Sequence, residues 1–394
     1  MHVIFRESHG LEETAQPVDL QQTPADMVVL SFSDSDLGAF SVGWHNAKED
    51  LPSLRLANLA ALQHPLSVDT YIEQTLRDAK AVLVRLIGGM PYWSYGLQQL
   101  RAVAEENGIA LAVLAADGRA DSQLDEISTL PVSTLRRLRQ LCDAGGPDAA
   151  SAALAQLALS AGLFARPKIG QKNPPRVGGW SLQNRLSCPA AFALRVIPKP
   201  AVVISFYLSY LTAADLAPIE AAAQALEARG FDVFGVFVPS LKEPESAAWL
   251  QRQMRLIAPV AILNATAFSG KGPDGASPLD IAEVPVFQMA LATSTRAAWA
   301  DTERGLSPAE LAMHVVLPEV DGRLFAGVGS FKDPAARDPQ LQFSRFIHKA
   351  DAPRIAAIAD RIRAHVDLSR VENAQKRPVL VLSTYPGKPW QMAH

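Results

Sequence analysis

Short, nearly unbroken apolar runs alternate with helical patterns along most of this 394-residue chain. In the first third, residues 27–32, 81–87 and 109–114 form such runs, and segments with the periodicity of helices lie between them. Strands that are apolar on both faces are typical of a parallel sheet that helices cover on both sides. The sequence therefore predicts an α/β fold that opens with a parallel sheet.

The same alternation restarts near residue 201. Strand-length apolar runs lie at 201–206, 231–238 and 260–263, and helical patterns at 218–229 and 245–257 separate them. Further expected elements are short strands at 284–289, 314–317 and 325–327, a helix at 351–367 and a last strand at 378–382. This second series predicts a second α/β domain.

A different composition lies between the two series. Residues 122–165 are helical in pattern and rich in alanine, and residues 166–200 carry six prolines and little periodicity. We therefore predict two Rossmann-like parallel-sheet domains joined by a helical and Pro/Gly-rich connection. The expected boundaries are an N-terminal α/β domain at 1–140, the connection at 141–200 and the second α/β domain at 201–394, with 378–394 as a segment that could lead into a further C-terminal region.

Composition excludes several classes of protein. The 37 Lys and Arg residues against 40 Asp and Glu residues give a net charge of −3, which favours neither nucleic acid nor an acidic membrane as a partner. Only two cysteines occur, which excludes a disulfide framework and suits a reducing compartment. The N-terminus lacks the layout of an export signal, and no apolar run approaches membrane-spanning length. We expect a cytoplasmic protein without a membrane partner.

The first candidate binding segment follows the apolar run at 81–87. Gly88 and Gly89 allow close approach of a ligand, and Tyr92 and Trp93 supply flat apolar faces for a planar or anionic molecule. Arg85, inside the apolar run, needs a partner and could bind a substrate carboxylate. The alternatives are a tight turn whose aromatic residues cap the sheet, and a structural ion pair for the arginine.

The second candidate segment follows the apolar run at 260–263. Asn264, Thr266 and Lys271 place amide, hydroxyl and ammonium groups at a strand end, a pattern that resembles a cradle for a carboxylate or oxyanion. Together with Arg85, Tyr92 and Trp93 they form the predicted substrate-binding set. The spacing of a phosphate-binding loop occurs nowhere, and the eight histidines lack metal-ligand spacing, so we assign no nucleotide site, metal ligand or catalytic residue to this chain.

Several motifs together resemble the large subunit of aerobic cobaltochelatase, the CobN-type family related to the porphyrin-binding large subunit of magnesium chelatase. The motifs lie in family order from about residue 25 to the end, and the ordered set is more specific than any one of them. They are LRLANL (54–59), HPLSVDTY (64–71), VRLIGGMPYWSYGL (84–97), VPSLKEPESAAW (238–249), LNATAFS (263–269), VPVFQM (284–289), LPEVDGR (317–323) and LSTYPGKP (382–389).

The resemblance implies a role in the ATP-dependent insertion of cobalt into hydrogenobyrinic acid a,c-diamide during aerobic cobalamin synthesis. In that family the large subunit binds the tetrapyrrole and the metal. Two smaller partners, an AAA+ ATPase subunit and its companion, supply the energy. ATP is then bound by another subunit, in agreement with the missing phosphate-binding loop.

Two departures from the family limit what the resemblance implies. Its members are much longer, so we expect this chain to correspond to their N-terminal region and not to be catalytic alone. Leu208 stands where the family often has an arginine after the tyrosine, which puts a substrate contact there in doubt. The alternative functions are a non-catalytic scaffold that docks the ATPase subunits or the rest of its own chain, a binding module for a small acid, and a large subunit of the magnesium-chelatase type.

Overall fold

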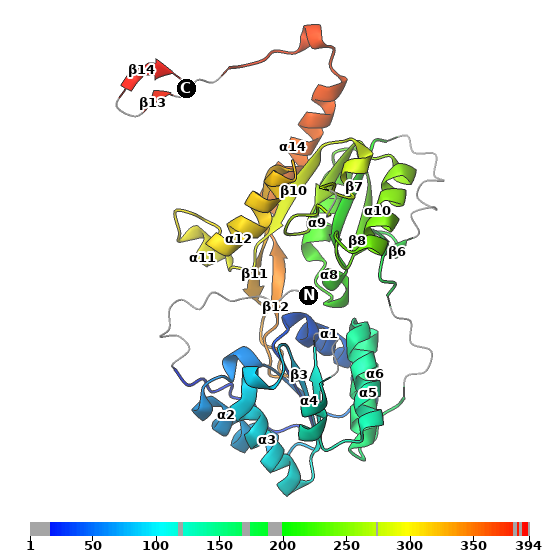
Figure 1. Cartoon of the computed structure of the whole chain (residues 1–394), viewed down its shortest axis with the longest axis vertical. Coiled ribbons are helices and arrows are strands. Elements are labelled where there is room, and N and C mark those ends of the chain that lie inside the picture. The colour runs from blue at the N-terminus through cyan, green and yellow to red at the C-terminus, as the bar shows by residue number, and fades with distance from the viewer. Residues whose placement is uncertain are drawn as a thin grey trace.

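The chain folds into two α/β lobes stacked along its long axis (Figure 1). The computed structural model describes residues 16–116, 121–167, 174–187, 199–272 and 275–380, and the backbone of 384–385 and 388–392. Lobe 1 is built on a four-stranded sheet and lobe 2 on an eight-stranded sheet. The predicted α/β class with two Rossmann-like sheet domains is confirmed.

The sheet of lobe 1 is entirely parallel, with strand order β2-β1-β3-β4. Its strands are β1 (Met27–Ser31), β2 (Leu54–Asn58), β3 (Ala81–Leu86) and β4 (Ala110–Ala115). Alternate residues of β1 face opposite cores: Met27 and Val29 belong to one apolar cluster, and Val28 and Leu30 to the other. Burial on both faces explains why these strands are apolar throughout.

Helices cover both faces of this sheet. The first apolar cluster takes up α1 (Asp34–His45), α5 (Val132–Ala144) and α6 (Pro147–Ser160), and the second takes up α2 (Pro65–Tyr71), α3 (Ser94–Asn107) and α4 (Ser122–Ile127). Ser33 begins α1 because its side chain accepts a hydrogen bond from the Asp36 amide at 3.2 Å. Gly108, at a φ of +68°, ends α3.

The sheet of lobe 2 is parallel at its centre and antiparallel at its edges, in the order β12-β11-β10-β9-β7-β8-β5-β6. The parallel strands are β7 (Ala201–Tyr207), β8 (Asp232–Val238), β9 (Ala261–Asn264), β10 (Val286–Leu291) and β11 (Leu324–Pro334). The antiparallel strands are β5 (Gly178–Ser181), β6 (Arg185–Ser187) and β12 (Phe346–Ala350). The second domain is therefore a parallel sheet with antiparallel edges, which the apolar pattern alone does not reveal.

The long helices of lobe 2 lie on opposite faces of its sheet. α9 (Ala217–Glu227) and α14 (Ala352–Arg370) pack in one apolar cluster, and α10 (Pro244–Ile257) packs in the other. The short helices are α8 (Leu208–Thr212), α11 (Arg296–Ala300), α12 (Pro308–Leu311) and α13 (Leu317–Val320). β13 (Thr384–Tyr385) and β14 (Lys388–Met392) pair apart from both sheets (Figure 1).

Residues 335–345, which we call the strap, connect β11 to β12 but pack on lobe 1. Leu341 is fully buried in the core beneath α1, and Arg55 of β2 donates to the Gln340 carbonyl at 2.8 Å. Gln22 donates to the Gln342 carbonyl at 3.0 Å. Lobe 1 is thus completed by a segment from the far end of the sequence.

Three expectations differ from the structure. Residues 132–160 form α5 and α6, which belong to the core of lobe 1, so the expected connection at 141–200 begins too early; much of its remainder, 168–173 and 188–198, lies outside the described residues. The expected strand at 314–317 belongs to η7 (Ala312–Val316) and the start of α13, because a short apolar run fits a buried helical turn as well as a strand. Residues 378–380 are not in a strand, and 381–382 lie outside the described residues.

Candidate functional site

One cleft lies between the lobes, at the edge of each sheet where its parallel strands end. We call this the carboxyl edge of a sheet, and the opposite edge, where the strands begin, the amino edge. This cleft has a volume of about 540 Å³. Lobe 1 contributes residues from the start of α1, the end of β3, the position after β4 and the end of α5. Lobe 2 contributes the last residue of β7 and residues that follow β7, β8 and β9. The principal lining residues are Asp36, Arg85, Cys142, Asp143, Tyr207, Ser209, Thr212, Ser240 and Phe268. Open α/β sheets bind ligands at such edges because loops and strand ends converge there.

Arg85 is the buried cation of the cleft. It is only 3% exposed, and its Nε donates to Asp36 at 3.2 Å while its Nη1 donates to Asp143 at 3.0 Å. Burial alone would lower the pKa of Arg85, but Asp36 and Asp143 outweigh that effect and raise the pKa above its ordinary value. Among the described residues, hydrogen bonds engage Nε and Nη1 but not Nη2. The guanidinium is therefore fixed in place and permanently charged.

Two further groups of the cleft stay protonated near neutral pH. Burial raises the pKa of the Cys142 thiol to about 12, so this cysteine is not a thiolate nucleophile. Burial also raises the pKa of Tyr207, whose hydroxyl donates to the Ala267 carbonyl at 2.7 Å. Tyr207 thereby ties the end of β7 to the loop after β9.

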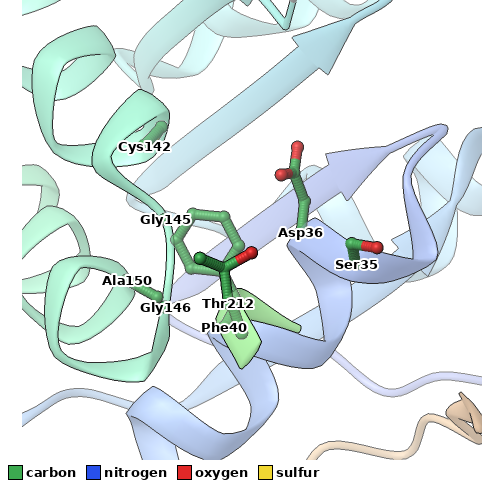
Figure 2. A pocket seen from close by; sticks show the side chains of 9 residues that line it. Ser35, Asp36, Phe40, Cys142, Gly145, Gly146, Ala150 and Thr212 are labelled. Atoms are coloured by element: carbon green, nitrogen blue, oxygen red, sulfur yellow. The ribbon is translucent and has the colours of Figure 1, made fainter. Parts of the chain in front are cut away.

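The floor of the cleft is formed where α8 meets lobe 1. Figure 2 shows Thr212 of α8 reaching in beside Phe40 and Gly145, in a small pocket of about 40 Å³. A side chain at Gly145, which has a φ of +69°, would also approach Thr212 to 3.2 Å. Among the other lining residues of the cleft, the Ser209 hydroxyl is buried without a hydrogen-bond partner among the described residues, and Phe268 is 44% exposed.

Asn264 is the last residue of β9 and Thr266 belongs to the loop after it, and neither lines the cleft. Both are fully buried, and their polar groups bond within the lobe. Asn264 accepts from Ser205 at 2.6 Å and donates to Gln288 at 2.7 Å, and the Thr266 hydroxyl donates to Asn264 at 2.9 Å. This network fixes the loop that carries Phe268 into the cleft.

The other predicted residues also lie away from the cleft lining. Trp93 is 5% exposed, and its indole donates to the Leu62 carbonyl at 2.7 Å, which places it in the core of lobe 1. Tyr92 is 66% exposed. Lys271 donates to the Val320 carbonyl at 3.1 Å. Of the six residues predicted for substrate binding, the structure brings only Arg85 into the cleft.

Comparison with known proteins gives the family. The CobN/Magnesium Chelatase family model matches residues 189–393, which is more than half of the chain. The chain belongs to the CobN/magnesium chelatase family.

Relatives within this family extend the match to nearly the whole chain. The aerobic cobaltochelatase subunits CobN of a Sinorhizobium species and of Pseudomonas aeruginosa are 33% and 32% identical to it over 98% of its length. The chain spans 31% of the length of each relative. The catalytic subunit of cobaltochelatase from Mycobacterium tuberculosis has the same fold over 91% of this chain and 29% of its own, with a TM-score of 0.67 and 23% identity.

Sequence reasoning missed most residues that line the cleft of this CobN-family chain. Tyr207 and Phe268 carried a usable signal, because each lies at or just after a predicted strand end. Asp143 carried none, because it belongs to α5, a helix whose docking on the sheet brings it to Arg85. Asp36 lies in the polar stretch 33–36 directly after the apolar run at 27–32, and it was not among the predicted site residues.

Within the described ranges, no group of three or more His, Cys, Asp or Glu side chains could hold a metal ion. No helix in the described part of the chain is both long and apolar enough to span a membrane.

Proposed function

We propose that this chain forms the N-terminal portion of a cobaltochelatase large subunit and that its cleft holds one edge of the tetrapyrrole. The proposed substrate is hydrogenobyrinic acid a,c-diamide, into which the assembled enzyme would insert cobalt at the expense of ATP. An AAA+ ATPase subunit and its companion would be the partners. The family match and the CobN relatives support the chelatase assignment.

A single observation carries the proposal for the cleft. A buried arginine is held by the carboxylates of two aspartates, at the place where the carboxyl edges of the two sheets meet. A guanidinium recognises carboxylates well, and Arg85 pays little conformational entropy on binding because Asp36 and Asp143 already fix it. The volume of about 540 Å³ suits a small ligand or part of a larger one. We assign the ring-edge carboxylate to Arg85 and an apolar contact to Phe268.

The remaining predicted residues take supporting roles in this proposal. Asn264 and Thr266 act as positioning residues, because they fix the loop that presents Phe268. We assign metal handling and removal of the pyrrole protons to no residue of this chain. Binding and orienting one edge of the substrate is the whole task proposed for the cleft.

The test is a titration of the chain with hydrogenobyrinic acid a,c-diamide, followed by absorbance and tryptophan fluorescence. Arg85→Gln should weaken binding by about tenfold or more, since a hydrogen bond to a charged group contributes roughly 1.5–3 kcal/mol. Arg55→Gln is the matched control, because Arg55 is also a buried arginine of the same sheet but bonds to Thr23 and the strap. Equal affinities of the two variants would remove Arg85 from the site.

A second variant tests the cleft at a residue other than Arg85, so that the test does not depend on the folding of Arg85→Gln. Phe268 has a φ of +65°, so Phe268→Asn keeps a residue that tolerates this conformation and removes only the aromatic face. We expect several-fold weaker binding with unchanged thermal unfolding. If the chain captures the ATPase subunits but binds no tetrapyrrole, the alternative function as a non-catalytic scaffold is supported instead.

A further inference from the structure

Exposed apolar side chains lie on α13, beside it and near the end of α14 in lobe 2. We call this set the α13 face, and it comprises Val316, Leu317, Val320, Leu324 and Leu368, which are between 37% and 67% exposed. Leu324 is the first residue of β11 and pairs with Phe287 near the start of β10. The α13 face therefore reaches the amino edge of the sheet at Leu324, whereas the cleft lies at the carboxyl edge.

Two residues of the α13 face, Leu324 and Leu368, border a hollow of about 700 Å³. Its other lining residues include Phe325 and His365 and the charged residues Glu319, Arg323 and Arg361. The ring of His365 meets Phe287 edge-on at 5.4 Å, and Arg361 donates to the Phe325 and Ala326 carbonyls, so the base of the hollow is already ordered. An apolar centre with an arginine at its border is typical of a protein interface.

The position of the α13 face points to its occupant. The CobN relatives are about three times as long as the region that this chain matches, and under the proposed function this chain is their N-terminal portion. α14 carries the polypeptide out of lobe 2, and Leu368 lies in its last turn, at the border of the hollow. Beyond α14, Val379 and Leu380 are 84% and 83% exposed, and Figure 1 shows this segment leading away from the lobe.

We infer that the α13 face is the docking surface for the polypeptide that follows this region in the CobN relatives. An apolar side chain of that polypeptide fills the hollow, and an acidic one meets Arg361. The two ends of lobe 2 then have different tasks: the carboxyl edge faces ligand, and the amino edge joins the remainder of the large subunit. This inference rests on family membership and is independent of what the cleft binds.

The test measures the accessibility of residue 320 to a maleimide reagent. Val320→Cys, in a background with Cys142→Ala and Cys188→Ala, is compared in this chain alone and in this chain joined to the remaining two-thirds of the Pseudomonas aeruginosa relative. We expect labelling to slow by about tenfold or more in the joined protein, because side chains within an interface core are shielded from solvent. Leu256→Cys on α10, which is 48% exposed in the chain, should label at similar rates in both.

Equal labelling of position 320 in both proteins would overturn the inference. So would protection in the chain alone that grows with its concentration, because a second copy would then occupy the face. If the joined protein does not fold, the same comparison is made at the aligned position of the intact Pseudomonas aeruginosa relative and of its N-terminal third. Rapid labelling of the aligned position in the intact relative would also contradict the proposed docking surface.

Discussion

The two lobes meet in two contrasting ways. At the strap, Leu341 is buried in the core of lobe 1, and Arg55 and Gln22 bond to strap carbonyls. Nearby, Lys332 of β11 forms a nearly buried ion pair with Asp34 of α1 at 3.1 Å. At the cleft, α8 approaches lobe 1 through Thr212, the next residue, Ala213, approaches Gly38, and beside these contacts lies an open volume lined by polar and apolar residues. One side fixes the lobes together, and the other side keeps space for a ligand.

The contrast shows how a cleft between two lobes can be held in shape. The strap supplies apolar burial and hydrogen bonds at once, so the lobes do not depend on contacts within the cleft for their arrangement. The polar groups of the cleft are then available for binding. Three substitutions test this comparison.

The largest effect is expected at the strap. Leu341→Ala should lower the free energy of unfolding by about 2–5 kcal/mol, because it leaves a cavity in the core of lobe 1. Urea unfolding followed by fluorescence measures the loss. Leu256→Ala, at a half-exposed position of α10, is the control and should cost about 0.5 kcal/mol or less. A similar small loss for Leu341→Ala would show that the strap does not tie the lobes.

An intermediate effect is expected at Asp215, which lies beside the strap and accepts the His348 amide at 3.0 Å. Burial raises the pKa of Asp215 to about 6, against an opposing effect of the His348 amide and of Lys332 and Arg345. The folded chain therefore binds this proton more tightly than the unfolded chain, and stability falls as pH rises from about 4 to above 6. Above that range the ionised carboxylate costs about 1–3 kcal/mol.

Asp215→Asn should remove this cost while keeping the oxygen that accepts the amide. We expect the variant to match the parent chain near pH 4 and to exceed its unfolding free energy near pH 8, as measured by urea titration at both values. Asp301→Asn, at an exposed position, serves as the control. If the unfolding free energy changes between pH 4 and pH 8 by the same amount in Asp215→Asn as in the parent chain, Asp215 is not a buried carboxyl with a raised pKa.

The smallest effect is expected at Tyr92, which is exposed and does not line the cleft. Tyr92→Ala should change tetrapyrrole affinity by less than about twofold, a difference near the limit of the titration. A clear loss of affinity would extend the binding surface from the cleft over η5 (Met90–Trp93). The ligand would then contact lobe 1 outside the cleft as well as within it.

The site was less accessible to sequence reasoning than the fold. Arg85 was identified because a charge within an apolar strand demands a partner, and an ion pair was one of the stated alternatives. The partners themselves, Asp36 and Asp143, lie 49 and 58 residues away. Trp93 resembled a ligand platform in the sequence, yet its indole bonds to the Leu62 carbonyl within the core. Residue type and strand-end position do not specify which side of a loop faces a cleft.

The sequence by itself determined the alternation of strands and helices, the α/β class and the resemblance to the CobN family, because apolar periodicity and local motifs are properties of neighbouring residues. Only the tertiary structure decided that the strap completes lobe 1, that α5 brings Asp143 to Arg85, and that the carboxyl edges of both sheets share one cleft. These features join residues far apart in the chain. Their pairing depends on how whole layers pack, and no local pattern encodes it.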